Sequence, residues 1–105
     1  MILYNVTVNI DHDIHDEWLQ WMKEKHIPDV LATGCFTNNK ICKMLSGEHD
    51  GGITYSIQYL CESQEKLDHY QATFAPALQE EHTSKYSGKF VAFRSLLEVV
   101  QNTDH

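Results

Sequence analysis

Residues 53–61 read Ile53-Thr54-Tyr55-Ser56-Ile57-Gln58-Tyr59-Leu60-Cys61, and every second side chain from Ile53 onward is apolar or aromatic. A period of two is typical of a β-strand that buries one face. Residues 47–52 precede this strand with three glycines, which adopt positive φ angles without strain and therefore indicate a turn. Residues 35–46 show a weaker strand pattern. The sequence thus predicts a β-hairpin whose first strand lies at the edge of a sheet.

The two ends of the chain carry the remaining strand patterns. Residues 1–10 alternate with apolar side chains at Ile2, Tyr4, Val6, Val8 and Ile10. Residues 90–100 are rich in β-branched and aromatic side chains, which favour strands, and alternate at Val91, Phe93, Leu97 and Val99. The polar tail from about residue 101 is expected to lie outside the fold.

One helix is expected between the first two strands. An apolar stripe begins at Ile14 and includes Trp18 and Trp21, and we expect Asp13 to cap the helix and Pro28 to end it near His26. After Pro28 a short turn is predicted, closed by Gly34 at a positive φ angle.

A second helix is expected between the last two strands. Ser63 is a suitable cap for it, and Leu67, Tyr70, Phe74 and Leu78 share one stripe. Pro76 should kink this helix or divide it in two, because proline lacks the N–H that a helix interior needs. Gly88 should end it.

The order of these elements is βαββαβ, which predicts an α+β, ferredoxin-like fold with a four-stranded antiparallel sheet in one domain of residues 1–105. The first and third strands should be central. We expect the helices to cover the sheet face with Val6, Val8, Ile53, Ile57, Phe93 and Leu97. The opposite face should then carry Asn5, Thr7, Asn9, Thr54, Ser56, Gln58 and Arg94, rimmed by Leu3, Leu60 and Phe90. A face of such mixed polarity is suited to a second copy of the chain, so a homodimer is predicted.

Composition and charge restrict the function. The 105 residues include 15 acids and 8 bases, and a net charge of −7 repels nucleic acids and anionic membranes, so neither is expected as a partner. No basic leader or long apolar run is visible. Three cysteines without C-x-x-C spacing are typical of reduced thiols, which favours a cytoplasmic location.

Several motifs occur together in the chain: Trp18-x-x-Trp21-Met22, His26-Ile27-Pro28-x-Val30-Leu31-Ala32-Thr33-Gly34, Gly51-Gly52-Ile53-Thr54-Tyr55 and Lys89-Phe90-Val91-Ala92-Phe93-Arg94. In these motifs the chain resembles, over nearly its whole length, a family of short bacterial proteins catalogued as a domain of unknown function. That family supplies no catalytic residues to transfer. In fold, the chain also resembles the dimeric α/β-barrel proteins, which include cofactor-free monooxygenases, muconolactone-isomerase-like enzymes and haem-handling proteins. This second resemblance implies two sheets packed face to face.

A ligand pocket between helices and sheet is the main functional hypothesis. We expect five residues to line it or to border it: Trp21, His26, Tyr59, His82 and Arg94. Aromatic side chains can enclose a flat ligand, a histidine can anchor it or carry a proton, and a strand arginine needs an anion or carbonyl partner. The two histidines are not expected to form a dyad, because the antiparallel helices should hold them near opposite ends of the third strand unless the break at Pro76 folds the second helical segment inward. Packing in the core is the alternative for these residues, and a contact in the dimer interface is the alternative for Arg94.

No metal site or cofactor is predicted. His12 and His15 lie among acids, but their spacing is not that of a helical metal-binding pair, and no cysteine is near. Two functions remain open. The chain either binds a flat or aromatic small molecule, with or without acid-base chemistry at His26 or His82, or serves as a protein-interaction or ligand-sensing module without catalysis. The sequence alone does not decide whether the protein is an enzyme.

Overall fold

The computed structural model describes residues 1–46 and 51–103. Its sheet consists of β1 (Ile2–Asp11), β2 (Asn38–Lys43), β3 (Gly52–Cys61) and β4 (Phe90–Glu98). The helical elements are η1 (His12–Ile14), α1 (His15–Trp21), η2 (Met22–His26), α2 (Ile27–Ala32), α3 (Gln64–Thr73) and α4 (Ala75–Lys85). None of the helices in the described ranges combines the length and apolar character that crossing a bilayer requires.

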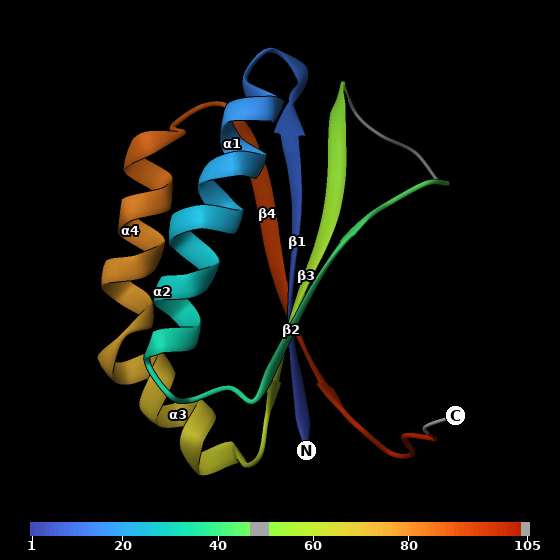
Figure 1. Ribbon diagram of the computed structural model, residues 1–105, viewed down its shortest axis with the longest axis vertical. Helices are drawn as coiled ribbons and strands as arrows, with labels where there is room; N and C mark the ends of the chain where they lie inside the picture. The colour runs from blue at the N-terminus through green and yellow to red at the C-terminus, as the bar shows by residue number, and fades with distance from the viewer. Residues whose placement is uncertain (47–50, 104–105) are drawn as a thin grey trace.

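The strands form one antiparallel sheet in the order β2-β3-β1-β4, and the helices all lie on one side of it (Figure 1). Tyr4 lies opposite Tyr59, and Val8 lies opposite Tyr55, so the alternating apolar residues of β1 and β3 share the helix-covered face. The central positions of β1 and β3 and the α+β, ferredoxin-like architecture are therefore confirmed. Of the turn predicted over residues 47–52, residues 47–50 lie outside the described residues.

The first helical region is longer than expected. Instead of ending near His26, the chain widens into the π-helical segment η2 and continues through α2 to Ala32, with Pro28 in the first turn of α2. Proline lacks an N–H, and its ring clashes with the carbonyl four residues earlier. The wider π-helical turn before Pro28 accommodates both the missing donor and the bulk of the ring. Asp13 is not the cap of α1; Ile14 occupies that position, and Lys89 Nζ donates instead to Asp13 Oδ2 at 3.1 Å.

The second helical region follows the prediction more closely. Ser63 Oγ accepts a hydrogen bond from the backbone N–H of Lys66 at 3.2 Å, which caps α3. Helix α3 ends at Thr73 and α4 begins at Ala75, so Pro76 begins a new helix and divides the region as expected. Gly34 and Gly88 have positive φ angles of 76° and 77° after the two helical regions.

Strand β4 shows the main error of the sequence-based prediction. Arg94 lies opposite Val6 and Ala92 opposite Val8, which places Arg94, Ala92 and Phe90 on the helix-covered face. Phe93 lies opposite Thr7, so Phe93, Val91 and Leu97 are on the open face, and Arg94 and Phe90 are not. Apolar residues occupy both faces of β4. The adjacent Leu96 and Leu97 also interrupt the alternation that would identify which face of the strand is buried. The register with β1 is what fixes the faces.

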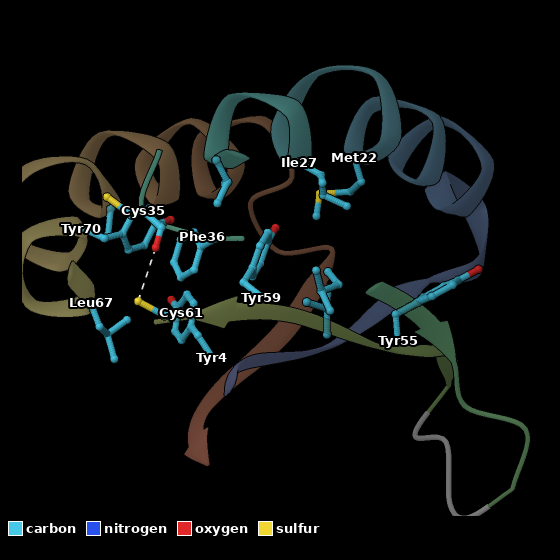
Figure 2. Packing of buried hydrophobic residues seen from close by; sticks show 14 of the residues in the cluster. Tyr4, Met22, Ile27, Cys35, Phe36, Tyr55, Tyr59, Cys61, Leu67 and Tyr70 are labelled. Carbon is cyan, nitrogen blue, oxygen red and sulfur yellow. Dashed lines mark hydrogen bonds between the residues drawn. The ribbon is translucent and has the colours of Figure 1, made fainter. Parts of the chain in front are cut away.

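The core lies between the helices and the sheet. Trp18, Ile10, Ile57, Leu67, Val30 and Cys61 are its largest fully buried side chains. At one end of the core, Figure 2 shows Tyr4, Phe36, Tyr59 and Tyr70 gathered above the sheet. Next to this aromatic group the packing is incomplete, and a cavity remains.

Candidate functional site

The cavity has a volume of about 40 Å³ and lies between α4, the α1–η2–α2 region and the sheet. Its apolar walls come from Val6, Val8, Met22, Val30, Ile57, Leu78, Phe90 and Ala92. Its polar side chains are Tyr4, His26, Tyr59, Tyr70, Gln79, His82 and Arg94. Four of the five predicted site residues, His26, Tyr59, His82 and Arg94, therefore come together around one cavity.

The two histidines are close to each other, contrary to expectation. Their ring centroids are 5.8 Å apart and the rings meet edge to face. Because the helical region runs on to Ala32, His26 lies in its middle instead of at its end. His82 lies on α4, after the break at Phe74, and is therefore placed beside His26. The expected separation of the two histidines along the third strand is therefore wrong, and the division of the helix at Pro76 is the condition under which the sequence allowed them to meet.

His82 is held in a neutral form by its surroundings. Trp18, which is completely buried, donates from Nε1 to His82 Nε2 at 2.9 Å. A nitrogen that accepts a hydrogen bond carries no proton, so the neutral ring of His82 is protonated at Nδ1. Burial lowers the pKa of His82 to about 4, and the nearby charges of His26 and Arg94 act in the same direction.

His26 lacks a comparable partner. Its Nδ1 is buried and has no hydrogen-bond partner, which is unusual for a buried polar atom. Burial lowers the pKa of His26, against the opposing effect of the Glu81 and Asp29 carboxylates. Trp21 stacks on the His26 ring at 5.2 Å and also contacts His82 and Tyr86. Trp21 thus packs against the two histidines without being part of the cavity wall.

The tyrosines provide neutral hydroxyl groups. Burial raises the pKa values of Tyr59 and Tyr70, so both phenols are protonated at ordinary pH. In Figure 2 the Tyr59 side chain extends from β3 toward the helices. Sequence reasoning missed Gln79. The sequence indicates Tyr4 and Tyr70 only as aromatic residues that could line such a pocket, and the antiparallel pairing of the two central strands puts Tyr4 on the face of Tyr59.

Among the residues that the structure describes, Arg94 is the only charged side chain in the cavity wall. It is exposed at the mouth, and the described part of the chain provides neither a salt bridge nor a hydrogen bond to its side chain. Its positive charge contributes to the lowered pKa values of His26 and His82 and offsets part of the rise in the pKa of Tyr70, so it is electrostatically close to three other residues of the wall. The cavity is therefore neutral inside and positive at its mouth.

The other polar candidates of the sequence have structural contacts. His15 pairs with the Tyr55 hydroxyl through Nε2 at 2.6 Å and with Asp16 through Nδ1 at 2.9 Å. Cys61 Sγ donates to the backbone carbonyl of Cys35 at 3.3 Å (Figure 2). Both of these cysteines are buried free thiols.

The fold and the cavity define a ferredoxin-like domain with a polar cavity between its helices and its sheet. Residues 1–100 match the model of a family described as a domain of unknown function, DUF4286, and the chain belongs to this family. The comparison with curated protein sequences gives no match.

Several solved structures share the fold at low sequence identity. A mutant of MhuD with two manganese protoporphyrin IX molecules bound per active site has a TM-score of 0.74 at 14% identity, covering 100% of both chains. A dimeric ferredoxin-like protein from an uncultured marine organism has a TM-score of 0.73 at 13% identity, again over 100% of both chains. SnoaB, a cofactor-independent oxygenase from Streptomyces nogalater, has a TM-score of 0.69 at 10% identity over 99% of this chain and 98% of its own.

Proposed function

We propose that this protein binds a flat small molecule between its helices and its sheet. The observation that carries the proposal is the convergence of His26, His82, Arg94 and the buried tyrosines on one cavity, with Nδ1 of His26 left unpaired. Ligand sites are typically apolar cavities in which a few polar groups converge, and this arrangement has that form. Binding of a flat porphyrin by the structurally similar MhuD mutant is consistent with such a ligand.

The size of the cavity limits what can be enclosed. An engineered cavity that binds benzene has a volume of about 150 Å³, whereas a single water needs roughly 10–15 Å³. A volume of about 40 Å³ therefore encloses a polar group or the edge of a ring, but not a whole ring. We infer that the rest of the ligand lies at the mouth, beside the exposed Arg94, or that Leu78 and Gln79 move to admit it.

Replacing one of two alanines by leucine tests this proposal. Ala92 lines the cavity from β4, so Ala92→Leu fills it, while Ala72→Leu adds the same atoms to the exposed surface of α3. In a thermal-shift screen of planar aromatic compounds, a compound that stabilises the wild type should stabilise Ala72→Leu equally and Ala92→Leu at least about tenfold more weakly in apparent Kd. Equal responses of the two variants would contradict binding in the cavity.

We further propose that the protein acts as a homodimer through the open face of the sheet. Val91, Phe93 and Leu97 are exposed there by 72%, 60% and 48%. Beside them, Ser56 Oγ donates to Asn5 Oδ1 at 2.6 Å, and Gln58 Nε2 donates to Ser56 at 3.2 Å. An apolar patch beside polar groups that already bond to each other is suited to a partner surface, and one structurally similar protein is described as dimeric. Two sheets would then pack face to face, as in a dimeric α/β barrel.

The alternative is a protein-interaction or ligand-sensing module without catalysis, and the same open face supports it. The free thiols of Cys35, Cys42 and Cys61 suit a reducing compartment, which supports the cytoplasm as the location. The net charge of −7 argues against nucleic acid as the partner.

A further inference from the structure

We infer that the ligand of the cavity is an organic anion, with a carboxylate as its charged group, and that the guanidinium of Arg94 binds it. This inference rests on the proposed function, because it specifies the chemistry of the molecule that occupies the cavity. It follows from the charges around the cavity, from the unpaired state of Arg94 and from the polar groups that have no partner.

The distribution of charge is the first step. The chain has 15 acidic and 8 basic residues, so a randomly chosen charged side chain is more often acidic. The described residues of the cavity wall nevertheless include one charged side chain, the cation Arg94, and no carboxylate. Lys25, Lys66 and Lys89 are each paired with an acid. Four other described cations also form no printed ion pair with a described residue, but they do not line the cavity: Lys23, Lys40, Lys43 and Lys85. In the described part of the chain, Arg94 has no such partner and can bind a negative group from outside.

The position of Arg94 is the second step. It lies on the helix-covered face of β4, opposite Val6, and not on the open face where a dimer contact would use it. A guanidinium presents parallel N–H donors that match the two oxygens of a carboxylate. The other described wall residues are apolar or neutral, so no carboxylate among them competes with a ligand for the guanidinium.

The neutral polar groups are the third step. Nδ1 of His26 is buried without a partner, and the phenols of Tyr59 and Tyr70 remain protonated. Such groups bind a hydroxyl, carbonyl or amide of a ligand without adding charge. His82 contributes less, because its Nε2 already accepts from Trp18 and its role is to help shape the wall. The predicted ligand therefore combines a carboxylate with a planar body and a second polar atom.

Benzoate and benzamide provide a direct test, because they have nearly the same shape and differ in charge. Dissociation constants would be measured by titration calorimetry or ligand-observed NMR at pH 7.5 and constant ionic strength. The wild type should bind benzoate at least about tenfold more tightly than benzamide, since charge-assisted hydrogen bonds are roughly twice as strong as neutral ones. Arg94→Gln should remove this preference and Arg94→Lys should retain part of it. Lys43→Gln, which removes an exposed cation from β2, should behave as the wild type.

The possible outcomes separate the two proposals. Equal binding of benzoate and benzamide by the wild type would overturn the inference of an anion while leaving binding in the cavity intact. A preference for benzoate that persists in a folded Arg94→Gln variant would overturn the assignment to Arg94. If the wild type binds neither probe, the inference of an anionic ligand fails. The proposed function also fails if no planar compound of the thermal-shift screen stabilises the wild type more than Ala92→Leu.

Discussion

At the scale of single residues, the site depends on how two histidines are protonated. Trp18 fixes the tautomer of His82, and Trp21 covers the ring of His26 from behind. Neither contact is visible in the sequence, where Trp18 and Trp21 are only two members of an apolar stripe. The Trp18 contact keeps His82 neutral, while Nδ1 of His26 is buried without a hydrogen-bond partner.

The low pKa of His82 predicts how stability depends on pH. The unfolded histidine binds a proton below about pH 6.5, while the folded one does so only below about pH 4. The stabilisation from His82 is thus complete above pH 6.5 and is lost as the pH falls toward 4, on the order of 3 kcal/mol in total. His82→Gln should reduce this loss in urea unfolding between pH 7 and pH 4.5.

The control for this prediction is His12→Gln, because His12 is exposed on the surface. This variant should keep the wild-type dependence on pH. If His82→Gln and the wild type lose the same free energy of unfolding over this range, His82 is not held in the neutral form that the structure indicates.

At the scale of secondary structure, breaks in the helices form the site. The π-helical segment η2 carries His26, and the division between α3 and α4 at Phe74 lets α4 carry His82 toward it. Both irregularities occur next to a proline, Pro28 or Pro76. The two prolines in the sequence indicate that each helical region is disturbed at these positions. The packing of the helices on the sheet determines that the first region continues after Pro28.

Gly34 provides a prediction at this scale. Its φ angle is 76°, and a Cβ atom built at this position would contact nothing within 4 Å. Substitution therefore tests backbone conformation without a steric clash. Gly34→Val should lower the free energy of unfolding by more than about 1 kcal/mol, because a β-branched residue is strained in the left-handed region. Gly34→Asn should cost clearly less, since asparagine tolerates this region. Chemical denaturation would measure both, and equal losses would contradict the explanation.

At the scale of the whole molecule, the sheet has one face in the core and one that exposes Val91, Phe93 and Leu97. The cavity and the open face are on opposite sides of the same strands, β1, β3 and β4. Ligand binding and association of two copies therefore use different residues and can be disturbed separately.

Ser56→Arg tests the dimer. The residue lies in the middle of the open face on β3, and in a symmetric dimer the substitution would bring like charges together in a buried interface at a cost of several kcal/mol. Light scattering at tens of micromolar should give a dimer for the wild type and a monomer for this variant. Gln71→Arg, on the exposed surface of α3, should remain dimeric. A monomeric wild type would rule out the homodimer.

The sequence was enough to predict the order of elements, the two central strands and the cap at Ser63, because these depend on local periodicity and on the chemistry of single residues. It also indicated four residues of the cavity wall. The buried face of β4 could not be predicted in this way, since apolar residues occupy both sides of the strand and the pairing with β1 selects one. The same holds for the 5.8 Å between the ring centroids of His26 and His82, because that distance depends on how two helical regions pack on one sheet. Local patterns specify elements, and contacts between residues far apart in the chain specify the site.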